Sequence, residues 1–449
     1  MPHIFPGRCC IPTRGSSERI TRDLEADTIF AVASGSGRAA ITVIRVSGPG
    51  TSAALSGLCG RGPPPRRASL RTLRDADGAV LDRGLVIWFP GPGTYTGEDS
   101  AELHLHGGRA VLEAVSAALL HLGARPAEPG EFTKRAFLNG RMDLLEAEAI
   151  GDLVAAETEA QRRQALRQLE GELGAIYRGW ADRLTLLLAR QEALIDFPDQ
   201  DLPDEVEAAV QKEISQLRAE MEAHLADGRR GERLREGLVF AIAGPPNVGK
   251  SSLMNALAGR EVAIVSSLPG TTRDALEARV VLGGVPVTLV DTAGLREAAD
   301  EIEAEGVRRA RAHAANADLV IAVVDQTVEV PPADGLLVAN KVDLGGRIPD
   351  GALGVSALRG QGLESLHARL AEETRRLTES SGPPPLTRAR HRAALEEVAA
   401  CLRTARAACL PELQAEDLRL AIRALGRITG TVGVEDILGS IFAQFCIGK

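Results

Sequence analysis

The segment 238–259 constrains the fold of this chain more than any other part of the sequence. It reads "LVFAIAGPPNVGKSSLMNALAG", a buried strand, then Gly244-x-x-x-x-Gly249-Lys250-Ser251, then a helix. In such a loop the backbone amides cradle phosphates, the lysine reaches the β and γ oxygens, and the serine ligates Mg²⁺. The segment therefore predicts an α/β domain that binds a nucleotide at the N-terminus of the helix.

Two later motifs supply groups near the metal and the γ-phosphate. "GTTRD" (270–274) contains Thr272, which can sense the γ-phosphate through Mg²⁺. "VTLVDTAG" (287–294) ends a buried strand and places Asp291 near the metal. The next residue is Leu295, where Ras-like proteins have the glutamine that orients the attacking water. Another group must therefore orient the water in this chain.

A fourth motif, "LLVANKVD" (336–343), decides which base is bound. The Asp343 carboxylate can accept hydrogen bonds from N1 and the exocyclic amine of guanine, and adenine offers no such donor pair. "VSAL" (355–358) fits the loop that closes over the base oxygen. The predicted GTP-binding residues are Asn247, Val248, Gly249, Lys250, Ser251, Ser252, Ser266, Thr271, Thr272, Asp291, Thr292, Ala293, Gly294, Asn340, Lys341, Asp343, Ser356 and Ala357.

The connection "QTVEVPPADG" (326–335) is shorter than the usual helical crossover between parallel strands. We therefore expect one helix of the nucleotide-binding domain to be lost or shortened here. The nucleotide loops lie at other strand ends, so binding should survive.

Hydrophobic periodicity divides the rest of the chain into an α+β domain, a helical domain and the inserted nucleotide-binding domain. Strands are expected at 39–46, 85–89 and 100–107, and a helix at 109–122. The predicted domains are 1–24, an N-terminal extension; 25–141, α+β; 142–232, all-α; 233–380, an α/β P-loop domain; and 381–449, the second part of the all-α domain.

Composition limits the cellular setting. The net charge of −9 argues against a chain that wraps nucleic acid over its whole surface. Six scattered cysteines show no disulfide framework, which suits a reducing compartment, and we expect a cytoplasmic protein without membrane spans. Residues 1–24 leave three interpretations open: a disordered tail, an over-extended start, or a transit peptide.

Taken together, the motifs of residues 25–449 resemble the MnmE (TrmE) family of tRNA-modification GTPases. The resemblance rests on "YTGEDSAELHLHGG", "GEFTKRAFLNGRMDLLEAEAIGDL", "GPPNVGKSSLMNALAGREVAIV", "GTTRD", "DTAGLREAADEIEAEG", "GRITG" and the terminal "FCIGK". It implies a homodimer with a tetrahydrofolate-binding N-terminal domain, a helical domain and an inserted GTPase domain. It also implies a heterotetramer with the FAD-dependent partner MnmG. Together the two would add a carboxymethylaminomethyl-type group to C5 of wobble uridine in tRNA.

The resemblance also suggests how hydrolysis proceeds without the Ras-like glutamine. Asn247, Ser266, Leu268 and Thr271 resemble a set that holds K⁺ against the phosphates, where a cation neutralises developing charge. Glu303 resembles the family's carboxylate that positions water, although by itself it reads as a solvated acid. The expected catalytic residues are Glu303, Lys250 and Cys446, with Mg²⁺ held by Ser251 and Thr272.

Four residues match the family's folate contacts: Arg45, Glu102, Arg141 and Lys449. The one-carbon donor would be 5,10-methylene- or 5-formyl-tetrahydrofolate. A carboxylate can pair with the guanine-like edge of a pterin, and cations suit its glutamate tail. His104 and His106 are two residues apart, so they lie on the same face of a strand. They are either zinc ligands or histidines of the core or folate pocket, and we favour the second interpretation.

The terminal "CIGK" does not suit prenylation, and Cys446 lacks nearby partners for a disulfide or a metal. We therefore expect an amphipathic helix at 435–445 to deliver Cys446 to the folate pocket of the same or the opposite subunit. An inert buried thiol is the alternative. Two other functions stay open: an Era-like regulatory GTPase of ribosome assembly, and a folate-dependent transferase whose GTPase only reports nucleotide state.

Overall fold

The computed structural model describes residues 27–35, 37, 39–196, 204–259, 277–291, 317–325, 335–345, 347–379, 383–432, 435–443 and 445–448. These residues form two compact units, one from the described residues of 1–147 and 434–449 and the other from those of 148–433. The final segment thus packs with the N-terminal part of the chain. Among the helices that the structure describes, none is long and apolar enough to cross a membrane.

The first unit is built on a six-stranded sheet in the order β3-β4-β5-β2-β1-β6, antiparallel except for the β1–β6 pair. Its elements are β1 (Ile29–Val32), β2 (Ile41–Ser47), α2 (Thr51–Cys59), β3 (Ser69–Arg74), β4 (Val80–Phe89), β5 (Ser100–His106), α3 (Arg109–His121), β6 (Arg125–Pro126), α4 (Glu131–Leu138) and α15 (Glu435–Phe442). The expected strands at 39–46, 85–89 and 100–107 and the helix at 109–122 are confirmed with shifted ends.

Strand periodicity gives this sheet two different faces. Ile44 and Leu103 point to the face covered by α2 and α3, where they pack with Leu58 and Leu119. Because side chains alternate along a strand, Arg45 and Glu102, which pair across β2 and β5, point to the opposite face. That second face therefore carries the polar groups expected to bind folate.

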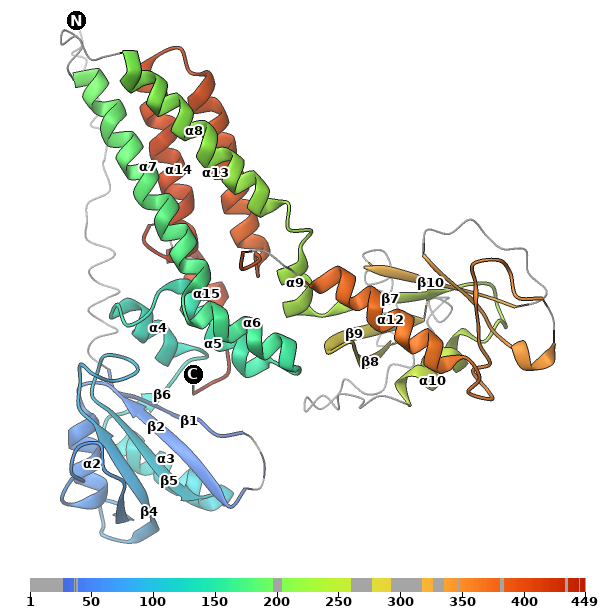
Figure 1. Cartoon of the computed structure of the whole chain (residues 1–449). Helices are drawn as coiled ribbons and strands as arrows, with labels where there is room; N and C mark the ends of the chain where they lie inside the picture. Colours follow the sequence, from blue (N-terminus) through green and yellow to red (C-terminus); the bar gives the residue numbers. More distant parts are fainter. Residues whose placement is uncertain are drawn as a thin grey trace, which may run out of the picture. The chain divides into compact units, whose positions relative to one another are not determined.

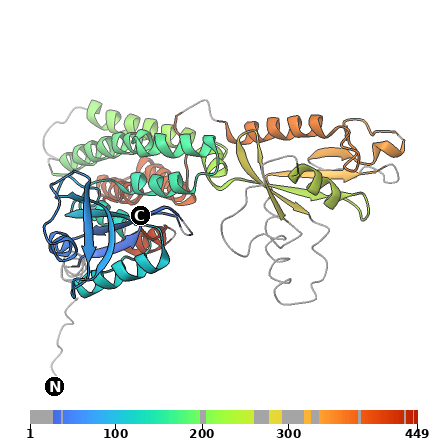
Figure 2. The same cartoon turned by 90° about the horizontal axis from the view of Figure 1, so that it is seen from below.

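The second unit contains a bundle of long helices and a parallel α/β domain. Figures 1 and 2 show α7, α8, α13 and α14 running side by side. The helices are α5 (Leu144–Ala155, which begins in the first unit), α6 (Glu159–Leu169), α7 (Glu172–Asp196), α8 (Asp204–Leu225), α9 (Arg230–Glu236), α13 (Ala389–Ala407) and α14 (Pro411–Thr429). A Thr158–Gln161 capping box starts α6, and Pro411 occupies the first turn of α14, where its missing N–H costs nothing.

A buried ion cluster ties α5 to α13. Glu148 is 1% exposed. Its carboxylate accepts two hydrogen bonds from the Arg390 guanidinium, both at 2.7 Å, and lies 3.0 Å from Nε2 of His391. Burial alone would raise the pKa of the Glu148 carboxyl, but His391 and Arg390 outweigh it and hold that pKa far below its usual range. Breaking such a pair would leave unpaired charge in the bundle.

The inserted domain has the sheet order β12-β11-β10-β7-β9-β8, parallel except for the β8–β9 hairpin. Its elements are β7 (Leu238–Ala243), α10 (Lys250–Ala258), β8 (Glu277–Leu282), β9 (Val285–Asp291), β10 (Leu319–Val324), β11 (Leu336–Ala339), the 3-10 helix η2 (Val342–Leu344), β12 (Leu353–Gly354) and α12 (Leu363–Thr378). The multidomain fold class is confirmed. Residues 326–334 lie outside the described residues, so the shortened crossover stays a prediction.

Candidate functional site

The phosphate loop follows the central strand β7 and leads into α10 at Lys250. Gly244 (φ 152°) and Gly249 (φ 93°) need glycine because a Cβ at these positions would collide with the Val323 carbonyl and the Asn340 amide. The Lys250 ammonium lies across the loop and donates to the carbonyls of Gly244 and Pro245 at 2.9 and 2.7 Å. The loop thus has the tight turn, helix N-terminus and lysine that phosphate binding requires.

Ser251 and Asp291 meet beside this loop. The Ser251 hydroxyl donates to the Asp291 carboxylate at 2.5 Å, and Asp291 is 2% exposed. A hydroxyl and a carboxylate are the oxygen ligands that Mg²⁺ prefers, so the pair fits a magnesium site. The sequence predicted both residues separately, and the fold brings them together across a separation of 40 residues.

Asn340 joins the phosphate loop to the loops expected around the base. Its amide donates to the Val248 carbonyl at 2.8 Å, and its side-chain oxygen accepts from the Ala357 N–H at 3.1 Å. Asn340 itself is 3% exposed. The first bond is buried and the second is partly buried, and both cross between segments, so Asn340 fixes the spacing between the two halves of the nucleotide site.

Lys341 adds a second link. Its ammonium donates to the Asn247 carbonyl at 2.6 Å and pairs with Asp325 at 2.9 Å. Asp325 follows β10 directly and was not among the residues predicted from the sequence, although a polar residue just after a buried strand in an α/β fold was an available signal. Asp343 lies in η2 and is half-buried.

A cavity of about 250 Å³ opens on the polar face of the first unit. Arg45 pairs with Glu102 at 3.0 Å and lies 5.6 Å from the Tyr95 ring, a cation–π distance. His104 contacts the other Glu102 oxygen at 3.3 Å. Both carboxylate oxygens are therefore oriented, as recognition of a pterin edge requires. Tyr95 and Arg66 also line this cavity and were not predicted from the sequence.

The remaining folate candidates lie nearby or outside the described residues. Arg141 is exposed and runs alongside Gly97, whose Cβ would come within 3.4 Å of the Arg141 side chain. Lys449 lies outside the described residues. His106 pairs with Asp82 at 2.8 Å and is 72% exposed. In the part of the chain that the structure describes, no three His, Cys, Asp or Glu side chains cluster as metal ligands.

The C-terminal segment contacts Arg45, which lines this cavity. Phe442 of α15 packs edge-on against Phe445 at 5.3 Å, and both contact Gly130, which opens α4 in a left-handed conformation (φ 68°). Arg45 donates to the Gly448 carbonyl at 3.5 Å. Cys446 is exposed and lies two residues before this contact.

A comparison with curated proteins decides the family. The chain is 63% identical over 429 residues to "tRNA modification GTPase MnmE" of Gluconacetobacter diazotrophicus, covering 94% of this chain and 98% of that protein. This chain belongs to the MnmE family of tRNA modification GTPases. As a family member it is a GTPase, and the Era-like interpretation is not supported.

Further comparisons agree with MnmE membership. Models described as "MnmE helical domain" and "GTP-binding protein TrmE N-terminus" match residues 144–446 and 28–141. The protein of the same name from Granulibacter bethesdensis is 55% identical, covering 95% of this chain and all of its own. The FeoB G domain from Methanococcus jannaschii matches 31% of this chain and 98% of its own length at 27% identity, with a TM-score of 0.23, too low to carry an argument.

Several MnmE-type site residues lie outside the described residues. These are Ser266, Leu268, Thr271, Thr272, Thr292, Ala293, Gly294, Glu303 and Lys449. Their roles stay predictions. The described candidates at 247–252, 291, 340, 341, 343, 356 and 357 all belong to the GTPase domain, and Arg45, Glu102 and Cys446 belong to the other unit.

Proposed function

We propose that this MnmE family member is a cytoplasmic, potassium-dependent GTPase that acts with an FAD-dependent partner on wobble uridine of certain tRNAs. A carboxymethylaminomethyl-type group would be added at C5, with its one-carbon unit drawn from a tetrahydrofolate derivative. The observation that carries this proposal is that one chain holds two separate built sites: the phosphate loop with its base motif, and the Arg45–Glu102 cavity.

In the GTPase site, Lys250 would bind the β and γ oxygens, and Ser251 would hold Mg²⁺. Asn247 sits in a left-handed turn (φ 64°) with an exposed side chain, so its amide oxygen is free to serve as a K⁺ ligand. A K⁺ ion supplies positive charge against the phosphates when bound. Glu303 would position the attacking water, and Asp343 would select guanine.

In the cavity of the first unit, Glu102 would accept hydrogen bonds from the pterin edge, oriented for that role by Arg45 and His104. Arg141 and Lys449 would face the glutamate tail. Cys446 lies only two residues before Gly448, whose carbonyl contacts Arg45. This closeness supports a role for the Cys446 thiol at the one-carbon unit.

The polar face of the sheet also offers a surface for a second copy of the chain. Leu70 and Leu85 form a cross-strand pair on this face and are 68% and 44% exposed, and Ile41 is 61% exposed. Exposed apolar side chains gathered on one sheet face suit a protein interface. We infer that the homodimer forms here.

The test is mass spectrometry of tRNA nucleosides from a strain that lacks this chain, complemented with the wild type or with Cys446→Ser. We expect the wobble modification to disappear in the deletion strain and to stay absent with Cys446→Ser, while purified Cys446→Ser hydrolyses GTP normally. Cys409→Ser, an exposed cysteine of the other unit, is the matched control and should restore modification. Full modification by Cys446→Ser would refute a chemical role for the thiol.

A further inference from the structure

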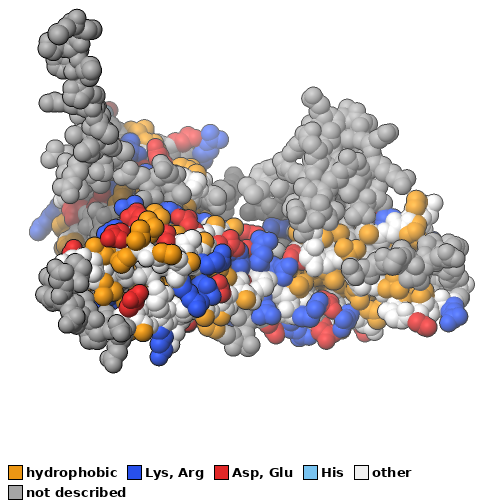
Figure 3. Space-filling view, turned by 90° about the horizontal axis from the view of Figure 1, so that it is seen from above, with side chains coloured by type: hydrophobic (Ala, Val, Ile, Leu, Met, Phe, Trp, Pro, Cys, Tyr) orange, Lys and Arg blue, Asp and Glu red, His pale blue; other side chains and the backbone are white. Residues whose placement is uncertain are grey.

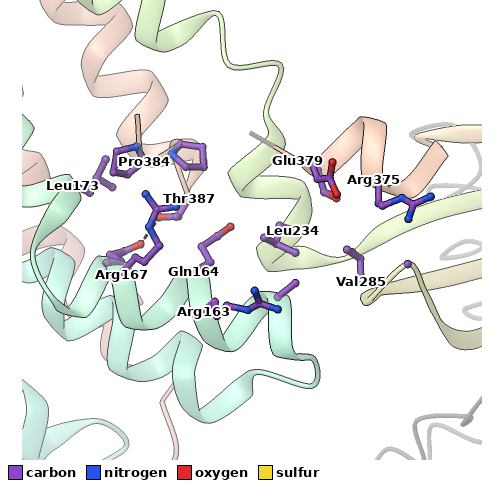
Figure 4. Close-up of a pocket in the computed structure, with 15 residues that line it drawn as sticks. Arg163, Gln164, Arg167, Leu173, Leu234, Val285, Arg375, Glu379, Pro384 and Thr387 are labelled. Carbon is purple, nitrogen blue, oxygen red and sulfur yellow. Dashed lines mark hydrogen bonds between the residues drawn. The ribbon is translucent and has the colours of Figure 1, made fainter. Parts of the chain in front are cut away.

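One cavity of the second unit lies apart from the GTP-binding loops. Its volume is about 380 Å³, within the range of small-ligand pockets. One wall is α6, and the other consists of the β8–β9 turn and the end of α12, which belong to the GTPase domain (Figure 4). We call this cavity the junction cleft.

The junction cleft sits where the GTPase domain is attached to the helical domain. Gln161 and Gln164 of α6 donate to the carbonyls of Arg235 and Gly231 in α9, at 3.1 and 3.0 Å. Only Gly237 separates α9 from β7, the strand that leads into the phosphate loop. A ligand in the cleft would therefore contact α9, the helix that connects the helical domain to the GTPase domain.

Two arginines on one face of α6 contribute positive charge to the cleft, whose lining also includes Arg375 of α12 and Glu379, the residue that follows α12. Arg163 and Arg167 are four residues apart, so their guanidinium groups project from the same side of the helix. Arg163 pairs with Glu159 at 3.2 Å and Arg167 with Glu172 at 2.7 Å. The arginine side chains are 69% and 51% exposed, and such exposed pairs hold weakly, so a phosphate can replace the carboxylates.

The rest of the lining suits a nucleobase. Leu234, Val285 and Pro384 form apolar walls against which a ring can stack. Gln164 points from α6 toward the middle of the cleft (Figure 4). Its side-chain oxygen is buried and has no hydrogen-bond partner among the described residues, so a rotation of the side chain that turned this oxygen into the cleft would let an N–H of a base satisfy it.

On these observations we propose that the junction cleft binds one nucleotide of the tRNA substrate, with the α6 arginines on its phosphates and the base against the apolar wall. This inference rests on the tRNA-directed function proposed above. On the face drawn in Figure 3, Lys and Arg side chains are interspersed with Asp and Glu, so RNA contact on that face would rely on small local sites and not on a broad basic surface. Because the cleft has one wall in each domain, tRNA in it biases the placement of the GTPase domain.

The test compares R163E/R167E with R403E/R406E in the full-length chain, with tRNA affinity measured over a series of KCl concentrations. Arg403 and Arg406 are exposed on α13, outside the cleft, and form the matched control. We expect the cleft variant to bind tRNA about tenfold or more weakly, and the slope of log K against log salt to fall by about 1 to 2. The control should keep the wild-type slope. GTP affinity and the thermal midpoint establish that each variant is folded.

If charge reversal prevents folding, R163Q/R167Q removes the charges alone and should reduce the salt slope by the same amount. In the wild type, tRNA should change the GTP hydrolysis rate, and in the cleft variant this response should be lost. Unchanged tRNA affinity and slope in a folded cleft variant would overturn the proposal. A second result would also overturn it: the wild type binds free uridine monophosphate saturably, the cleft substitutions abolish that binding, and tRNA affinity does not change. Failure of the proposed function would be seen in a different experiment, because the deletion strain would then keep its normal wobble nucleosides.

Discussion

Replacing Asn340 with alanine should uncouple the phosphate loop from the base loops. The substitution removes two hydrogen bonds: the buried one to the Val248 carbonyl at 2.8 Å and the partly buried one from the Ala357 N–H at 3.1 Å. Each abandoned backbone group costs about 1–3 kcal/mol, so the binding-competent arrangement loses about 2–6 kcal/mol. Since apparent affinity falls with the population of that arrangement, the lower figure alone corresponds to a roughly 30-fold weaker GTP complex.

The assay is titration of the full-length chain with a fluorescent GTP analogue, paired with hydrogen exchange of residues 244–251. We expect weaker binding together with faster exchange of the phosphate-loop amides. Asn139→Ala is the matched control, because it removes a comparable amide-to-carbonyl bond, to Thr96 at 2.7 Å, in the other unit. It should leave GTP affinity unchanged. If Asn340→Ala binds GTP within about twofold of the wild type, the two halves of the site are positioned by something else.

Three further predictions test other parts of the molecule. GTP hydrolysis should be faster in K⁺ than in Na⁺, and Asn247→Ala should remove the difference; equal wild-type rates in both salts would contradict the K⁺ assignment. Leu85→Asp should shift the chain from dimer to monomer in light scattering, whereas Leu186→Asp, at an exposed position on α7, should not. Glu148 has a lowered pKa in the folded state, so its stabilisation is present above the unfolded value of 4.5 and is lost as pH falls below it. Glu148→Gln should therefore reduce the free energy of unfolding by roughly 3–5 kcal/mol at neutral pH and flatten the decline in acid, as measured by denaturant titration across pH.

The nucleotide site could be predicted well because its information is local. The Gly244-to-Ser251 pattern fixes a turn, a helix start and a lysine within eight consecutive residues, and the structure has all three. By contrast, the sequence around Glu148 reads as a charged helix, yet Glu148 is buried against Arg390, 242 residues away. Periodicity identifies a helix face but not the partner that neutralises a charge on it.

The position of the C-terminal segment could not be predicted from the sequence either, and here the energies of the contacts add a second reason. Its polar link to the cavity, from Arg45 to the Gly448 carbonyl, spans 403 residues of sequence and measures 3.5 Å, the limit of hydrogen-bond geometry. A bond this long contributes less than the buried 2.8 Å bond of Asn340. The placement of Cys446 must therefore depend on the packing of Phe442 and Phe445 against Gly130, where any side chain larger than hydrogen would collide with the Phe442 backbone. Shape complementarity between residues so far apart is a property of the folded molecule, and no short motif encodes it.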